Sequence, residues 1–229
     1  LAHDGVAVDT KAYGAAVGLA AAGVVAANAQ KAGSVTALVD DEAEVNLASG
    51  LIRIKSLREG KTSAYSLAGA GGVLAGNASV AQARETGLVQ ASIGQGVTIA
   101  APGGAVQIEA LSRPQVAADS LGYGGAIFSA VGLSLAEAVA DTKIKATIGT
   151  GGKIEADSLA VSALTQLAGT SPTVRSYAEA IGGGALLGAN AANSVAKSSL
   201  VIVASLGSNL AIGHDDAAEK QDEKQPPKK

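Results

Sequence analysis

The stretch that decides the fold is KATIGTGGKIEADSLAVSA, residues 145–163. Apolar and polar residues alternate with a period of two in its first four residues, again in 153–155 and again in 159–163. The glycine-rich segment 149–152 separates the first two pieces. Alternation of this kind, rich in Val and Ile and interrupted by glycine, is typical of half-buried β-strands joined by tight turns. The stretch therefore predicts a set of short strands.

The same pieces recur along the chain in one order, which indicates an internal repeat of about 55 residues. The first piece occurs four times, each time with an alanine at the same place, and the spacing of these alanines is nearly constant. They are Ala37, Ala91, Ala146 and Ala204. Since equivalent positions lie above one another when repeats stack, we predict that these four alanines form a ladder.

The tyrosines follow a similar spacing. Each of them stands at or near the start of a long uncharged segment of Ala and Gly. These residues are Tyr13, Tyr65, Tyr123 and Tyr177. We predict that they form a second ladder, with their rings packed at a corner or an edge of the fold. An exposed aromatic stripe that binds sugars is the alternative.

A unit made of short strands cannot bury its apolar face alone, but it forms a continuous core when it stacks on similar units. We therefore predict an all-β fold, a parallel β-solenoid of about four repeats of roughly 55 residues. The repeat domain covers residues 1–213, with units at approximately 11–62, 63–116, 117–170 and 171–213. The sequence leaves open whether a unit is one wide coil or two or three narrow ones.

The composition favours a core of small side chains. Hydrophobic residues make up 48% of the 229 residues, aromatic residues only 2%, and 30 residues are glycine. A net charge of -3 argues against the basic surface of a dedicated nucleic-acid-binding protein, so we expect no nucleic-acid partner. The absence of Cys excludes disulfides and thiol catalysis. Because the chain has no Met and begins at Leu1, we interpret it as part of a longer protein.

Residues 214–229 differ from the repeats, because they combine Lys, Asp and Glu with Gln and Pro and lack apolar periodicity. We predict a disordered charged tail or linker there. The solenoid before it should have unpaired strand edges, which recruit further strands. Its expected partners therefore include further solenoid repeats of the same chain and, by end-to-end self-association, a second copy.

Residues suited to catalysis are few. His3 and His214 lie near opposite ends of the chain, and we interpret both as solvated. The acidic run 40–44 offers oxygen ligands for Ca²⁺, although we favour an exposed turn. Segment 149–153 has the glycines of a phosphate-binding loop but lacks its Lys-Ser/Thr ending. We expect no enzyme, no catalytic residue, no metal and no cofactor; a carbohydrate-active solenoid would need acids that recur on one face.

Two long uncharged segments support a different hypothesis. Residues 12–30 and 63–83 are long enough to cross a bilayer as helices, and Gly14 and Gly18 have the small-xxx-small spacing of packed membrane helices. The alternative is thus an Ala/Gly-rich membrane-inserting helical protein with glycine-zipper packing. Each glycine in a helix interior costs about 1 kcal/mol, so we favour the solenoid.

The strand-like segments 130–141, 143–149 and 154–163 follow one another directly. In this succession, over roughly residues 13–213, the chain resembles the β-strand-repeat regions of giant bacterial exoproteins, the filamentous-haemagglutinin-like and autotransporter-type adhesins. The resemblance implies a structural or adhesive segment of a protein that is secreted or lies on the exterior of the bacterial outer membrane. It also implies an extended stalk, a role in cell adhesion and virulence, and a ligand on a host, matrix or neighbouring-cell surface.

Overall fold

The computed structural model describes residues 1–165 and 174–213 and confirms the predicted all-β parallel solenoid. Within these ranges eleven strands belong to one sheet, and neighbouring strands in it are parallel. The strands are β1 (Ala2–Asp4), β2 (Val8–Lys31), β3 (Ser34–Val39), β4 (Glu44–Asn46), β5 (Gly50–Ile93), β6 (Thr98–Ile148), β7 (Lys153–Thr165), β8 (Val174–Gly184), β9 (Leu187–Ser198), β10 (Val201–Leu206) and β11 (Ala211–Gly213).

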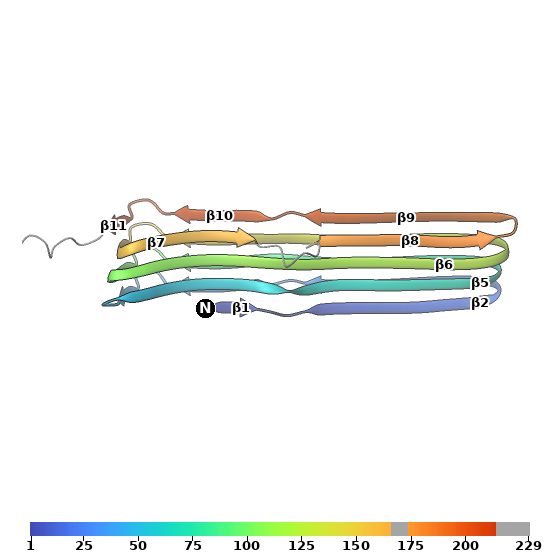
Figure 1. Ribbon diagram of the computed structural model, residues 1–229, viewed down its shortest axis with the longest axis horizontal. Helices are drawn as coiled ribbons and strands as arrows, with labels where there is room; N and C mark the ends of the chain where they lie inside the picture. Colours follow the sequence, from blue (N-terminus) through green and yellow to red (C-terminus); the bar gives the residue numbers. More distant parts are fainter. Residues whose placement is uncertain (166–173, 214–229) are drawn as a thin grey trace, which may run out of the picture.

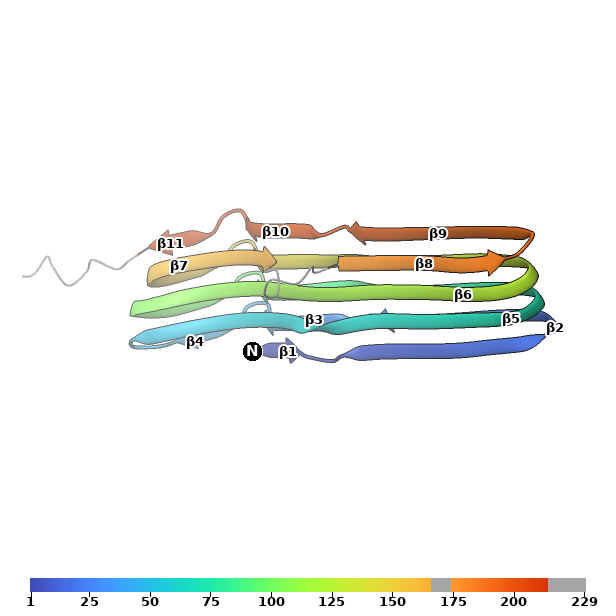
Figure 2. The same ribbon diagram turned by 45° about the vertical axis from the view of Figure 1, so that its right-hand side comes forward.

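Each repeat is one wide, flattened coil, which answers the question that the sequence leaves open (Figures 1 and 2). Strands β5 and β6 run along one side of the coil, pass round a bend at the right-hand end of Figure 1 and return along the other side. We call the first side, residues 50–72 in the second coil, the outgoing wall, and the second side, residues 74–93, the return wall. The step from one coil to the next is slightly longer between β6 and β8 than between β5 and β6.

The end of the coil opposite the bend has a third, short side, formed by β4 and its equivalents in the following coils. A turn links it to the return wall. In this turn the Glu42 amide donates to the Gln95 carbonyl of the next coil at 2.7 Å, and the Gln95 amide donates to Asp41 Oδ1 at 2.8 Å. The acidic run of the first coil is thus the hydrogen-bonded counterpart of the glycine turn above it.

The core changes in character along the coil. Where three sides meet, which we call the wide end, buried Ile and Val side chains fill the interior, and they include Val89, Ile99, Val106, Ile108 and Ile144. Between the two long walls, which we call the flat region, the buried cluster consists almost entirely of alanine. Its members are Ala27, Ala29, Ala64, Ala81, Ala83, Val116, Ala118, Ala136, Ala138 and Ala140.

Glycine allows the two walls of the flat region to approach each other. A Cβ atom at Gly122 would overlap Asn77 Oδ1 on the opposite wall, and one at Gly14 would lie 2.6 Å from a methyl group of Val25. At both places a larger inward side chain faces a residue without a side chain. Most of the other buried residues of these two walls are Ala or Ser, which are small enough for a narrow interior.

The predicted alanine ladder is present. Ala37 pairs with Ala91, Ala91 with Ala146, and Ala146 with Ala204, each in direct register between neighbouring coils. All four lie on the return wall, and Ala37, Ala91 and Ala146 belong to the wide-end core, whereas Ala204 in the last described coil is exposed.

The predicted tyrosine ladder is wrong. Tyr13 pairs with Leu67, whereas Tyr65 pairs with Lys11 below it and with Asp119 above it. The physical reason is that the spacing of the tyrosines in the sequence differs from the step of the sheet register at every coil. Each tyrosine is thus displaced along its strand relative to the next.

The helical alternative is also wrong, because both long uncharged segments are strands, residues 12–30 within β2 and residues 63–83 within β5. In the described part of the chain no helix has the length and apolar character needed to cross a membrane. Small residues are frequent here because alternate positions face the narrow interior. The predicted tail 214–229 and the junction between the units 117–170 and 171–213 lie outside the described residues.

Candidate binding surfaces

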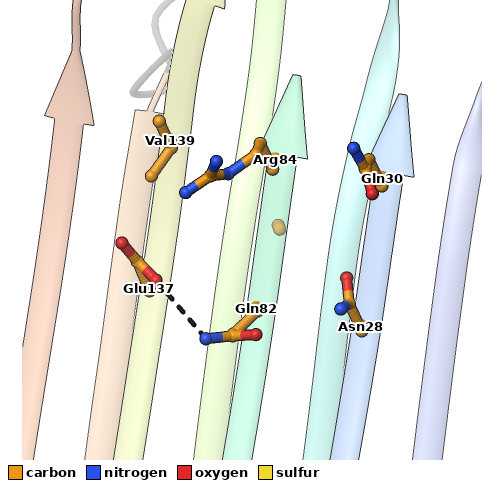
Figure 3. A pocket seen from close by; sticks show the side chains of 7 residues that line it. Asn28, Gln30, Gln82, Arg84, Glu137 and Val139 are labelled. Carbon is orange, nitrogen blue, oxygen red and sulfur yellow. Dashed lines mark hydrogen bonds between the residues drawn. The ribbon is translucent and has the colours of Figure 1, made fainter. Parts of the chain in front are cut away.

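Outward side chains of the return wall line a shallow groove of about 210 Å³ (Figure 3). One row across three coils consists of Asn28, Gln82 and Glu137, and the neighbouring row contains Gln30 and Arg84. The Gln82 amide donates to Glu137 Oε2 at 3.4 Å. Amide, guanidinium and carboxylate groups thus lie together on one open surface, although no sequence pattern groups them before the register is known.

This groove is suited to hydrogen bonding. Glu137 is the one carboxylate among the described residues that line it. A second hollow of about 190 Å³ shares Gln82 and Glu137 and extends over the apolar side chains of Val80 and Leu135. The two hollows together form a polar surface with an apolar border.

The outgoing wall carries the four tyrosines on its outer face. All four lie within three neighbouring rows, at positions 11–15, 65–69, 119–123 and 177–181 of the four coils, and we call this area the tyrosine strip. The rings are exposed to solvent in three cases, with exposed fractions of 65% for Tyr13, 41% for Tyr123 and 49% for Tyr177. The interpretation that they pack at a corner or an edge is therefore wrong.

Tyrosines of the strip make contacts both between neighbouring coils and within one strand. The ring centroids of Tyr13 and Tyr65 are 5.6 Å apart with a tilt of 47°. Desolvation, followed by the neighbouring tyrosines and Asp119, raises the pKa of Tyr65. The Tyr177 hydroxyl donates to Glu179 Oε2 at 2.7 Å, and this hydrogen bond is the main reason that the pKa of Tyr177 is raised. Both phenols are therefore neutral hydrogen-bonding groups at physiological pH.

A buried ionic cluster lies at the junction of the wide end and the flat region, and sequence analysis missed it. Arg58 and Glu85 are each 1% exposed and Lys31 is 5% exposed, while Asp4 lies beside them. Arg58 Nε lies 3.2 Å from Glu85 Oε1 and 3.5 Å from Asp4 Oδ2, and Lys31 Nζ lies 3.3 Å from the same Asp4 oxygen. The four charges balance, so the cluster is a neutral internal tie between the first two coils.

Opposing influences act on the two acids of this cluster. Burial raises the pKa of Glu85 despite the nearby cations Arg58 and Lys31. Desolvation also raises the pKa of Asp4, but hydrogen bonds from the Val6 amide and Lys31, together with the positive charges, outweigh it and lower that pKa overall. Glu85 is thus the group of the cluster that takes up a proton most readily on mild acidification.

The remaining residues singled out by the sequence serve local structure. His3 Nε2 lies 3.2 Å from Glu59 Oε1 on the surface. Gly151 adopts a φ of 72° in the turn 149–152, and its amide donates to the Ser208 carbonyl of the next coil, so this segment is a turn of the solenoid. The described residues include no group of three or more His, Cys, Asp or Glu that could hold a metal ion. His214 lies outside the described residues.

Comparison with known proteins gives no relative, since no family model, no curated protein and no solved structure matches the chain. The geometry itself thus leaves two candidate surfaces, the polar groove of the return wall and the tyrosine strip of the outgoing wall.

Proposed function

We propose that this chain is a structural and adhesive segment of a secreted or surface-exposed bacterial protein, and that it works as a rigid contact surface rather than as an enzyme. The observation that carries the proposal is the wide coil with an interior filled by its own small side chains and two broad outer faces. A wall such as 50–72 extends for about 75 Å at the usual rise per residue. Each coil adds only about 4.8 Å along the stack.

These dimensions favour a broad surface over extension alone. Each step along the axis uses a whole repeat of the chain, and most of that length is laid out sideways as two flat walls. Function in such a fold resides in side chains that repeat on an outer face, because buried alanine side chains fill the interior of the flat region. A stalk of many such coils would present the same face repeatedly.

A further coil is the partner that fits the last described coil. Ile202, Leu206 and Ile212 occupy inward rows of the wide end, yet they are 45%, 53% and 50% exposed among the described residues. Their counterparts one coil below, Ile144, Ile148 and Ile154, are all buried. Unpaired edges of this kind recruit strands, which supports stacking of further repeats on this coil.

The surface assignment is tested on cells that produce the complete protein from which the segment comes. Antibodies raised against residues 1–213 should label intact cells or detect the protein in the culture medium. Labelling that appears only after the cells are lysed would overturn the proposal.

Adhesion is tested with beads coated with the segment, which should adhere to host cells, matrix or neighbouring cells. The matched control is a variant that lacks residues 94–121, because this deletion removes about half a coil and breaks the register. A second variant lacks residues 94–148, one full step of the β5–β6 register at the return wall, and joins Ile93 to the turn glycine Gly149. It should keep the β spectrum and adhere more strongly than the half-coil control, because it removes one coil with Tyr123 and Glu137 but leaves the outer faces of the other coils in register. Equal adhesion by the half-coil control would contradict a role of the folded surface.

A further inference from the structure

We propose that the tyrosine strip binds an extended, uncharged, β-linked oligosaccharide that lies across the coils, parallel to the axis of the stack. The proposal rests on the adhesive function above and names the class of its ligand. Four observations support it: the distribution of the tyrosines, their exposure, their spacing and the charges around them.

The chain concentrates its aromatic residues on one face. It contains four tyrosines, one phenylalanine and no tryptophan, and every tyrosine faces outward from the outgoing wall. Each coil supplies one tyrosine, and the four stay within three neighbouring rows. Phe128, the remaining aromatic residue, lies at the bend between the walls. This arrangement gives one aromatic ring for each step along the stack.

Packing of the core does not explain these rings. The buried clusters consist of Ala, Val, Ile and Leu residues, and none of the four tyrosines belongs to them. Exposed tyrosine combines a flat apolar ring, which stacks on the C–H face of a sugar, with a hydroxyl that hydrogen-bonds to it. The surface next to the Tyr123 ring carries only small side chains, because Gly69 and Ala15 occupy the row of Tyr123 in the two preceding coils.

The spacing of the rings matches a linear glycan. Neighbouring coils are separated by about 4.8 Å, the distance between hydrogen-bonded strands. This distance is close to the length that one β-linked pyranose adds to an extended chain. Tyr65 and Tyr177 lie in the same row, each paired with Asp119 of the coil between them, so their positions are about 9.6 Å apart. A ligand that runs parallel to the axis along this row therefore meets a tyrosine at every second sugar, whereas a coiled α-linked glycan leaves this register after a few units.

The charges indicate an uncharged ligand. Arg175 lies 2.6 Å from Asp119, Tyr177 hydrogen-bonds to Glu179, and Lys11 lies 3.7 Å from Asp9. Each carboxylate in and beside the strip thus has a partner within the protein, and no block of one sign attracts a polyanion or a polycation. Paired carboxylate, guanidinium and phenol groups are well suited to the hydroxyl groups of a neutral sugar.

Cellohexaose is the probe that tests the proposal, with maltohexaose as the α-linked control and heparin as the acidic one. Titration of the segment by calorimetry should show binding of cellohexaose in preference to both controls. The double variant Tyr65→Ser and Tyr177→Ser should bind cellohexaose about tenfold or more weakly, because two stacking contacts are removed. Phe128→Ser, which removes an exposed ring at the bend, should leave the affinity unchanged.

Equal binding of maltohexaose, absence of cellohexaose binding, or full affinity in the double variant would each overturn the glycan assignment. Circular dichroism of each variant verifies that the solenoid is intact. The bead assay separates this result from the wider function. Beads that still adhere after periodate oxidation of the target surface, but lose adhesion in the double tyrosine variant, would indicate a protein ligand and refute the glycan while leaving the adhesive function in place.

Discussion

The wide end and the flat region of the coil use the same parallel ladder to build two different interiors. At the wide end three sides enclose Ile and Val side chains such as Ile108 and Ile144, which are fully buried. In the flat region two walls meet through alanines such as Ala118 and Ala138, which are also fully buried. Complete burial therefore does not require large side chains when the walls lie close enough.

This difference predicts opposite sensitivities. Removal of atoms creates a cavity at the wide end, but in the flat region there is little left to remove. Addition of atoms forces the walls apart in the flat region, where glycine and alanine set their distance. The ionic cluster at the junction lies where the two interiors meet, so it is the most sensitive point of the comparison.

The largest effect is expected from Arg58→Met. The substitution keeps an unbranched apolar stem but removes the guanidinium group and leaves Glu85 buried without that cation, so the unfolding free energy should fall by about 3–5 kcal/mol at pH 7. Urea unfolding followed by circular dichroism measures the loss. Arg53→Met is the matched control, because Arg53 is exposed and bonds to Gln107 on the outer face. An equal loss in both variants would refute a special role of the buried pair.

The pH dependence of Arg58→Met sharpens this test. The pKa of Glu85 is raised above its ordinary 4.5, so the folded state holds this proton more tightly than the unfolded state. The Glu85 contribution is therefore most favourable below pH 4.5 and is lost as the pH rises through the raised pKa. Loss of Arg58 should raise that pKa further, so the variant should regain stability on acidification to about pH 5, and adding Glu85→Gln should remove this dependence. The lowered pKa of Asp4 acts oppositely, with stability lost as the pH falls below 3.8.

The second prediction concerns truncation at the wide end. Ile108→Ala should lower the unfolding free energy by about 2–5 kcal/mol, because it leaves a cavity among fully buried neighbours. Ala138→Gly, the corresponding truncation in the flat region, should cost only about 1 kcal/mol. Denaturant unfolding of the two variants measures both values. Similar losses in the two variants would contradict the predicted difference in sensitivity between the wide end and the flat region.

Much of this fold follows from the sequence, because equivalent residues of successive repeats pair with one another in a parallel solenoid. The alternation of 145–163 predicts the strands, and the separation of the landmark alanines predicts a register that Ala37 and Ala91 obey. Coil width does not follow, since a repeat of this length fits one wide coil or several narrow ones. Contacts between the outgoing and return walls, which hold the core together, decide it.

The tyrosine strip is predictable only in part. The spacing of the tyrosines suggests a shared surface, but it differs from the register step at every coil, so counting residues leads to the wrong rows. The side of the sheet follows from the alternation, because Ala64 and Ser66 flank Tyr65 and face inward.

The ionic cluster is likewise predictable only in part from the sequence. Arg58 continues the inward series Ile54 and Ser56, but charged residues are expected on the outside, and their buried partners come from distant segments.

The third prediction concerns enlargement in the flat region. Ala138→Leu should lower the unfolding free energy by about 1–3 kcal/mol or more, since the walls have to separate to accept the larger side chain. Ala160→Leu is the control, because Ala160 is exposed on the outgoing wall and has space for a larger side chain. If the thermal midpoint of Ala138→Leu equals that of the control, the flat region holds more internal space than its buried alanines indicate.

The smallest effect is expected on the outer face of the wide end. Lys55 Nζ and Glu109 Oε2 lie 3.0 Å apart on neighbouring coils, with side chains 21% and 22% exposed. A double-mutant cycle with Lys55→Ala and Glu109→Ala should give an interaction of about 0.2–1 kcal/mol that decreases at high salt, because water and ions screen both charges. An interaction as large as the loss in Arg58→Met would mean that ion pairs on the outer walls hold the coils together. A small value assigns the cohesion of the stack to the backbone ladder and to the two interiors, and it leaves the outer side chains free to vary without loss of the fold.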